Sequence, residues 1–296
     1  MNITGDHKYN YMFLFKSISG LQSHLAEVRG MSKAIGFVPT MGALHDGHTS
    51  LITRSIESGN YTVVSIYVNP TQFNESDDLA KYPRPISDDL GKLNRLGVDV
   101  VFLPTDEEIY PDGTQTAPDV PLGHLGNTLE AAFRPGHFEG VVQVMDRLLR
   151  IVRPDILFMG NKDLQQIAVV RKLIEFANFK CKLVGLPIIR EPHGLARSSR
   201  NERLTPADRE AAAVIYNTLK ETYQNYHELT FSQLKQAALK RLSIPPFRPE
   251  YFEFVRTDTM KILDARPDDP IPVSVVTAVW CRDVRLIDNM EMSGSE

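Results

Sequence analysis

The chain has 296 residues, of which 42% are hydrophobic and 24% charged, and its formal net charge is −4. This composition excludes an intrinsically disordered protein and argues against a surface coated with positive charge for nucleic acid. The two cysteines, Cys181 and Cys281, form no Cys-x-x-Cys motif. Their pattern is typical of a reducing compartment and offers no thiolate metal site.

The first residues of the chain are polar and carry no apolar signal core. No apolar stretch is long enough to span a bilayer. We therefore expect a cytosolic protein without a membrane partner, whose residues 1–12 form a loose tail. The length favours two domains.

Short apolar runs alternate with helical segments over the first two thirds of the chain. The predicted strands are residues 34–38, 62–68, 98–103, 156–159 and 182–186, and the predicted helices are 19–28, 49–58, 88–95, 138–151 and 164–177. Strands without strict polar alternation are typical of parallel sheets that are buried on both faces. The pattern predicts an α/β domain over residues 1–189, with a Rossmann-like, doubly wound parallel sheet.

The pattern changes near residue 190. Helices are predicted over 206–223 and 230–242, the first with Thr205 as N-cap and Pro206 at its first position. Strand-like runs follow at 251–256, 271–276 and 279–280. We expect a smaller α+β domain over residues 190–296.

Two histidines follow the strand predicted at 34–38. The sequence reads Pro39-Thr40-Met41-Gly42-Ala43-Leu44-His45-Asp46-Gly47-His48. Residues three apart share a helix face, and a helix N-terminus after a parallel strand favours anions. The pattern predicts a nucleotide triphosphate held against two imidazoles. The alternative is a pair of solvent-exposed histidines at a loop–helix junction.

Other polar segments follow predicted strands, where ligands bind in open α/β sheets. Asn69 and Gln72 offer neutral amides, although Asn69-Pro70 is also a turn signal. Lys162 beside a helix start is a phosphate ligand, and Asp163 either caps that helix or binds a ribose. The residues between 194 and 201 are small, hydroxylated and basic, so they either wrap a triphosphate, with Arg200 on phosphate oxygens, or form a linker.

Two further clusters are open to more than one interpretation. Arg134 and His137 add a cation and an imidazole before a predicted helix. Asp88 and Asp89 either mark a helix N-terminus or form a carboxylate pair beside Mg²⁺.

Taken together and in this order, these segments resemble the pantothenate synthetase family, the pantoate–β-alanine ligases. The matching stretches are residues 39–48, 68–73, 82–84, 134–138, 162–163, 165–166 and 198–201, within a resemblance that runs from Ile35 to about Leu204 and loosely to 284–289. The histidine motif alone is shared with nucleotidylyltransferases and class I aminoacyl-tRNA synthetases. Its combination with the amide and Ser-Ser-Arg-Asn segments is more specific.

The resemblance implies a cytosolic homodimer that uses ATP and Mg²⁺. Pantoate attacks the α-phosphorus to give pantoyl adenylate and pyrophosphate, and the β-alanine amine then attacks the acyl carbon to give pantothenate and AMP. The resemblance assigns catalysis to His45, His48, Lys162 and Arg200. It implies pantoate contacts at Asn69, Gln72, Arg134 and Gln166, a β-alanine contact at Gln72, and ATP contacts at Met41, Gly42, Ala43, Leu44, His45, Asp46, Gly47, His48, Gly160, Asn161, Lys162, Asp163, Ile189, Arg197, Ser198, Ser199 and Arg200.

Three residues depart from the family pattern. Asn161 stands where a charged or longer polar residue is usual, Ala131 where glycine is common, and Arg197 where methionine is expected. We expect Ala131 to tighten the pantoate wall. Arg197 either adds a cation near the triphosphate or points to solvent.

Two other functions fit parts of the pattern. A pantetheine-phosphate adenylyltransferase would use the same scaffold, but such proteins usually lack a second domain of this size. A nucleotide-binding paralogue without catalysis would not need His45, His48, Lys162 and Arg200 together.

Overall fold

The computed structural model describes residues 11–72, 79–80, 82–114 and 117–292. Its strands are β1 (Phe13–Phe15), β2 (Ile35–Thr40), β3 (Tyr61–Ile66), β4 (Val100–Phe102), β5 (Ile156–Gly160), β6 (Lys182–Leu186), β7 (Phe247–Arg256), β8 (Val273–Cys281) and β9 (Val284–Glu291). The α-helices are α1 (Ile18–Gly30), α2 (Asp46–Glu57), α4 (Ile86–Leu96), α5 (Asp106–Ile109), α6 (Glu130–Phe133), α7 (His137–Val152), α8 (Leu164–Phe176), α9 (Pro206–Ala211), α10 (Ala213–Gln224) and α11 (Phe231–Leu242). Short 3₁₀ turns are η1 (Pro70–Gln72), η2 (Gly123–Gly126), η3 (Asn161–Asp163) and η4 (Ser199–Arg203).

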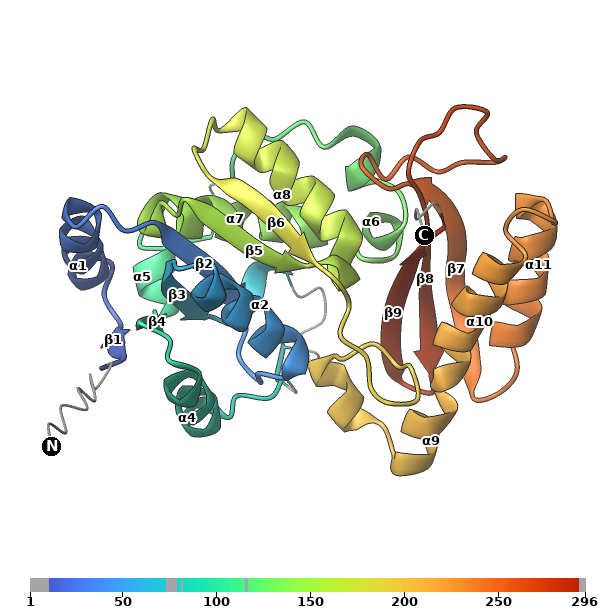
Figure 1. Cartoon of the computed structure of the whole chain (residues 1–296), viewed down its shortest axis with the longest axis horizontal. Helices are drawn as coiled ribbons and strands as arrows, with labels where there is room; N and C mark the ends of the chain where they lie inside the picture. Colours follow the sequence, from blue (N-terminus) through green and yellow to red (C-terminus); the bar gives the residue numbers. More distant parts are fainter. Residues whose placement is uncertain (1–10, 73–78, 81, 115–116, 293–296) are drawn as a thin grey trace, which may run out of the picture.

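The larger sheet has the strand order β1-β4-β3-β2-β5-β6 (Figure 1), and all its pairings are parallel. The five strands predicted between residues 34 and 186 are present, which confirms the doubly wound α/β class. The chain runs outward from β2 through β3 to β4, and then from β5 to β6 on the other side. The switch point therefore lies between β2 and β5, where such sheets bind ligands.

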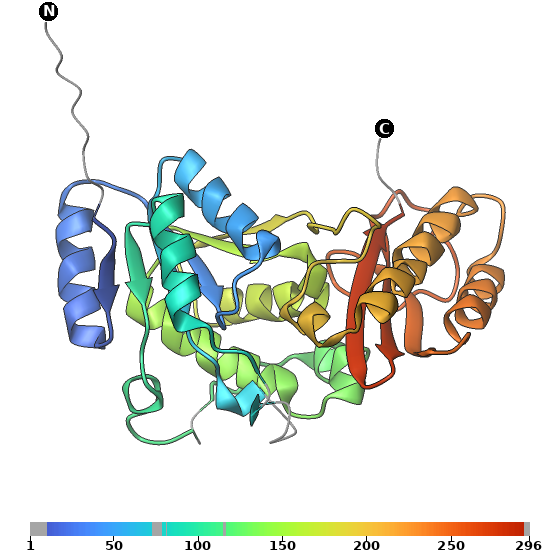
Figure 2. The same ribbon diagram turned by 90° about the horizontal axis from the view of Figure 1, so that it is seen from below.

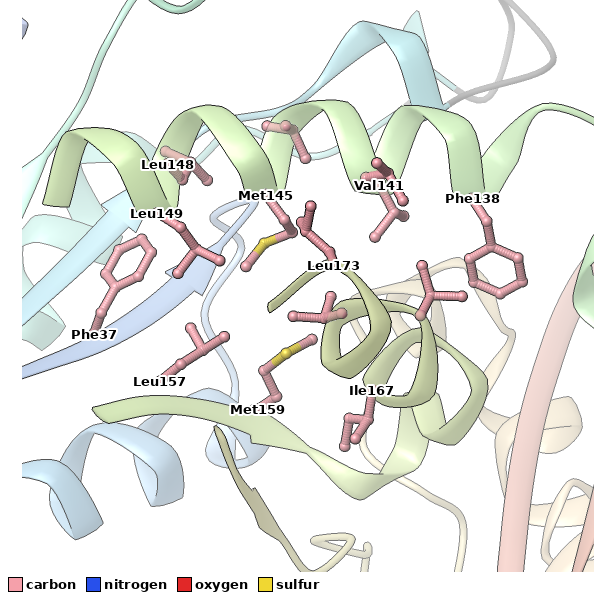
Figure 3. Close-up of a cluster of buried hydrophobic side chains, with 14 of the residues drawn as sticks. Phe37, Phe138, Val141, Met145, Leu148, Leu149, Leu157, Met159, Ile167 and Leu173 are labelled. Carbon is pink, nitrogen blue, oxygen red and sulfur yellow. The ribbon is translucent and has the colours of Figure 1, made fainter. Parts of the chain in front are cut away.

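Helices cover both faces of this sheet. On one face, Phe37, Leu157 and Met159 pack against side chains of α7 and α8 (Figure 3). On the other, Val38 and Phe158 belong to a core that α2 and α4 complete. Neighbouring strand residues thus point alternately into two cores, which explains why the strands read as unbroken apolar runs.

The smaller sheet is antiparallel, with the order β7-β8-β9, and lies with α10 and α11 at the opposite end of the molecule from α1 (Figures 1 and 2). Phe231 of α11 stacks on Phe254 of β7 with ring centroids 3.8 Å apart. The other sheet face contributes Tyr251 and Val276 to the core shared with α7 and α8. The expected α+β unit is confirmed as a class, while its boundary at residue 190 stays a prediction.

Several elements differ from the sequence-based expectation. The predicted helix 206–223 is divided at Ala212, where no glycine or proline marks the break. The strand-like runs 271–276 and 279–280 form one strand, because Thr277 stays inside it by donating its hydroxyl to Tyr251 O at 2.8 Å. Strand β1 is too short and too exposed to show a pattern. Strand β9 was not predicted.

No helix in the described part of the chain is both long and apolar enough to cross a membrane.

Candidate active site

A cavity of about 210 Å³ opens at the carboxyl ends of β2 and β5, where the switch point predicts a ligand. Most of the candidate residues line it: Met41, His45, Gly47, His48, Asn69, Gln72, Gly160, Lys162, Asp163, Gln166, Ile189, Arg197, Ser198, Ser199 and Arg200. The candidates Gly42, Ala43, Leu44, Asp46, Asn161 and Arg134 do not line it. Of the matching segment 68–73, Phe73 lies outside the described residues.

The two histidines form the N-terminus of α2. His45 is the N-cap, and its Nδ1 accepts from the backbone N–H of Gly47 at 3.1 Å. His48 Nδ1 accepts from the backbone N–H of His45 at 3.4 Å, so the two rings complete a capping box. A neutral imidazole that accepts at Nδ1 carries its proton on Nε2. Both rings therefore keep an Nε2–H donor, and both line the cavity.

Both imidazoles are held neutral in the ligand-free cavity. Burial, with the charges of Lys162, Arg197 and Lys92, lowers the pKa of His45 to about 4. Burial, reinforced by His45 and Lys162, lowers the pKa of His48 to about 3. The histidines thus act as oriented hydrogen-bond donors near pH 7, while positive charge at the site comes from lysine and arginine.

A carboxylate from α4 fixes the loop before the histidines. Asp89 is fully buried and accepts from the backbone N–H groups of Ala43 and Leu44, both at 2.8 Å. Ala43 and Gly42 have φ values of +49° and +80°, a left-handed turn that needs such support. Lys92 donates to Leu44 O at 2.6 Å and adds a second tie.

This placement separates Asp88 from Asp89. Asp88 is exposed in the first turn of α4, whereas both oxygens of Asp89 are engaged by backbone donors. The two carboxylates do not converge on one point and therefore do not form the magnesium pair that the sequence left open. Asp88 fits the alternative interpretation, because it lies in the first turn of a helix. Asp89 is a buried residue that stabilises the loop before the two histidines.

Lys162 is held between the two sheets. Asn289 of β9 donates to Asn161 O at 2.8 Å and to Lys162 O at 3.0 Å. The Lys162 ammonium lies 3.4 Å from Asp163 Oδ2. The side chain of Asn161 faces Gly185, where an added Cβ would meet its Oδ1 at 2.2 Å. Asn161 therefore packs against β6 instead of facing the nucleotide cavity.

The amide wall is built from neutral side chains. Gln72 is buried; its Nε2 donates to Met41 Sδ at 3.0 Å, and its Oε1 accepts from Asn69 Nδ2 at 3.2 Å. Asn69 also donates to Gly140 O and accepts from Tyr110 at 2.8 Å, so its amide holds Gln72 in place. Gln166 faces the cavity from α8.

The loop over the cavity is anchored by Glu191 and Asn201. Asn201 is buried and donates to Glu191 Oε1 at 2.9 Å and to Ala196 O at 3.1 Å. This bonding holds the backbone on both sides of Ser198 and Arg200, which line the cavity. In the Ser-Ser-Arg-Asn segment, Asn201 thus stabilises the loop, whereas residues 198–200 line the cavity.

Arg197, the departure from the family pattern, reaches the histidine motif. Its Nη2 lies 2.9 Å from Asp46 Oδ2, and its Nη1 lies 3.8 Å from Glu191 Oε1. Its Nε is buried without a hydrogen-bond partner among the described residues. The guanidinium therefore joins the loop to the start of α2, and the Arg197 side chain lines the cavity.

Neither Arg134 nor Ala131 lines the cavity that holds the histidines. Arg134 Nη1 is 3.1 Å from His137 Nε2 and 4.0 Å from Glu130 Oε2, and it faces two neighbouring cavities. Ala131 is buried in the core and lines none of these cavities. The expectation that Ala131 tightens the pantoate wall is therefore wrong.

Sequence reasoning missed an apolar wall. One face of α7 presents Val141, Val144, Met145 and Leu148 to the cavity. Their spacing is an ordinary helical apolar stripe, so nothing local distinguishes them from core residues. Tyr82 also lines the cavity, and its hydroxyl lies 3.3 Å from Ser199 Oγ; its place in the matching stretch 82–84 was the available signal.

Comparison with known proteins agrees with this geometry. Residues 13–291 match the model of the family described as pantoate-beta-alanine ligase. The pantothenate synthetase of Azobacteroides pseudotrichonymphae is 41% identical over 281 residues, 94% of this chain and 99% of the relative, and that of Bacteroides thetaiotaomicron is 41% identical over 283 residues, 95% and 99%.

Two solved structures have the same architecture. The pantothenate synthetase of Thermus thermophilus superposes with a TM-score of 0.88 at 35% identity, covering 96% of this chain and 100% of that one. The pantoate-beta-alanine ligase of Francisella tularensis, solved with beta-gamma ATP and beta-alanine, has a TM-score of 0.78 at 33% identity, with 96% and 99% covered. The chain belongs to the pantoate-beta-alanine ligase family.

Proposed function

We propose that this protein is a ligase that condenses (R)-pantoate with β-alanine, using ATP and passing through pantoyl adenylate. One observation carries the proposal: a single cavity joins imidazole donors, a lysine and an arginine on one side to neutral amides and an apolar helix face on the other. The first set suits phosphates. The second suits a small branched hydroxy acid.

In the first step, a carboxylate oxygen of pantoate attacks the α-phosphorus, and the bond to the bridging oxygen of pyrophosphate breaks. Charge develops on the α-phosphate and on the leaving group. The Nε2–H groups of His45 and His48, with Lys162 and Arg200, would stabilise that charge from fixed positions. Phosphoryl chemistry of this kind needs positioning and electrostatics more than covalent catalysis.

In the second step, the β-alanine amine attacks the acyl carbon and AMP leaves. We assign Gln72 to both pantoate and β-alanine, because its neutral amide can donate a hydrogen bond to a carboxylate and accept one from a hydroxyl or an amine. We assign the adenosine to the backbone near Gly160 and Ile189, with Asp163 on the ribose.

Magnesium enters this proposal as part of the substrate MgATP. No group of three or more histidine, cysteine or acidic side chains converges within the described residues. Mg²⁺ commonly keeps several waters and uses substrate phosphates as ligands, which fits a cavity whose charged side chains, apart from Asp163, are cationic. We also infer a homodimer in the cytoplasm, in line with the family resemblance; sedimentation of the purified protein tests the dimer.

The experiment for the whole proposal is direct. The protein is incubated with ATP, Mg²⁺, D-pantoate and β-alanine, and pantothenate is measured by mass. Exchange of pyrophosphate into ATP that requires pantoate would support the adenylate. Exchange that requires a phosphorylated acceptor would instead favour a pantetheine-phosphate adenylyltransferase. ATP binding without AMP formation would indicate a non-catalytic paralogue.

We expect Gln72→Ala and Gln166→Ala to weaken pantoate binding more than ATP binding. Both amides face the cavity, and neither carries a charge that would attract the phosphates of ATP. Titration calorimetry with each ligand measures the two affinities. Gln22→Ala, an exposed glutamine on α1, is the control. Unchanged pantoate affinity in both cavity variants would show that the acid binds elsewhere.

Arg197→Met should weaken ATP binding, and more so at low ionic strength. The charged side chain of Arg197 lines the cavity, and charge contacts fade as salt shortens the screening length to about 10 Å at 0.1 M. The measurement is the ATP dissociation constant across a salt series. Arg54→Met, on the exposed side of α2, is the matched control. Overlapping curves for wild type and Arg197→Met would show that Arg197 does not contact ATP and that its guanidinium only pairs with protein carboxylates such as Asp46.

A further inference from the structure

A second cavity lies on the other side of the phosphate-binding segments. Its volume is about 480 Å³. It shares Lys162, Asp163, Ser198 and Arg200 with the first cavity, and the rest of its wall comes largely from the C-terminal sheet. The two cavities therefore meet at a set of residues that includes Lys162 and Arg200, which we assign to the phosphates of ATP.

Three carboxylates of this cavity are paired with two arginines. Arg285 donates to Glu130 Oε2 at 2.7 Å and to Glu250 Oε2 at 2.9 Å. Arg190 donates to both oxygens of Asp288, at 2.6 and 2.9 Å. Two guanidinium groups thus offset most of the charge of three carboxylates, which reduces the repulsion that these acids exert on an anion in the cavity.

One cation of the wall has no such counter-charge. The guanidinium of Arg248 stacks over the Trp280 ring, 5.5 Å from its centroid. Within the described part of the chain, no carboxylate lies within 4.0 Å of it to form an ion pair. Trp280 Nε1 donates to Glu250, which fixes the indole under the arginine. Arg248 is thus an exposed cation with a set orientation at this cavity.

We propose that the second cavity receives the pyrophosphate released by adenylation, and that Arg248 binds this anion as it leaves. The inference rests on the proposed function. The leaving oxygen departs roughly in line with, and opposite to, the attacking carboxylate. Gln72 and Gln166, assigned to the acid, line the first cavity and not the second. Pyrophosphate would pass from Lys162 and Arg200, which face both cavities, toward Arg248.

Pyrophosphate exchange into ATP tests this assignment, because pyrophosphate must then enter by the same route. We expect Arg248→Gln to raise the KM for pyrophosphate about fivefold, the size of ~1 kcal/mol for a partly exposed charge contact. The KM for ATP should not change, since Arg248 does not line the first cavity. Arg248→Lys should recover part of the effect. Arg256→Gln, at the other end of β7 and paired with Asp258, is the matched control.

Three results would overturn the inference: an unchanged KM for pyrophosphate in Arg248→Gln, an equal rise in the KM for ATP, or a rise only in the KM for β-alanine, which would make the cavity the entrance for that substrate. If pantoate supports no exchange at all, the proposed function fails. Calorimetric titration of magnesium pyrophosphate into the ligand-free protein then still tests the cavity. Weaker binding by Arg248→Gln than by Arg256→Gln would uphold the site, and equal binding would reject it.

Discussion

His48→Ala should lower the rate of adenylate formation by about a hundredfold or more while ATP still binds. A preorganised donor to developing phosphate charge typically contributes roughly 10²–10³ in rate. We assign this role to His48, because its Nδ1 accepts from the backbone N–H of His45 and its Nε2–H is left to donate to a ligand. Rapid-quench measurement of the adenylate, with ATP affinity measured separately, gives the two quantities.

The control for this prediction is His227→Ala, which removes an exposed imidazole distant in sequence from the motif. It should leave the adenylation rate unchanged. An effect of less than about threefold in His48→Ala would remove this residue from the transition state, because truncation of a group that acts there lowers the rate directly.

Glu130→Ala should cost about 3 kcal/mol of unfolding free energy. Glu130 is buried at the start of α6. Its carboxylate accepts hydrogen bonds from Arg285 at 2.7 Å and from Tyr251 at 2.6 Å. Removing one partner of a buried ion pair leaves the other without full compensation, which typically costs ~3–5 kcal/mol. Arg285 keeps Glu250 as a partner, so we expect the lower value. The urea midpoint measures the loss, and Glu175→Gln on exposed α8 surface is the control.

The same carboxylate predicts a pH dependence. Burial by itself would raise the pKa of Glu130, but hydrogen bonds and charge from Arg285 outweigh it and lower the pKa to about 2. A lowered folded-state pKa adds stability above the unfolded value near 4.5, and this stability is lost as the pH falls toward about 2. Glu130→Gln should flatten the stability profile in that window. A profile as steep as that of the wild type would assign the acid sensitivity to other groups.

The histidine motif was predictable because its signals are local. A buried strand, a glycine turn and two histidines at helical spacing occupy consecutive residues, and the expected strand, helix and cavity are present. The helix begins at Asp46, three residues before the predicted start. Its N-cap is His45, and histidine is not one of the residues that usually mark an N-cap, so the earlier start was not predicted.

Supporting residues were less accessible to sequence reasoning, because their partners are distant. Asp89 stabilises a turn 46 positions earlier, and Glu130 meets an arginine 155 positions later. No local pattern separates Asp89, a buried anchor, from its exposed neighbour Asp88. The adjacent glutamines of α8 show the same limit: Gln165 is buried against backbone groups and Gln166 faces the cavity, a difference set by packing around the helix.

The hydrogen bonds of Asn289 have a consequence for how the enzyme moves. They join β9 to the backbone of Asn161 and Lys162, and Arg285 of the same strand forms an ion pair with Glu130. A rigid-body rotation of the C-terminal unit would have to break these hydrogen bonds and this ion pair together. The small sheet therefore holds the C-terminal unit in place, and we propose that the loop with Arg197, Ser198 and Arg200 shields the proposed adenylate from water. Changes in that loop should alter the partition between hydrolysis and product more than changes in the sheet.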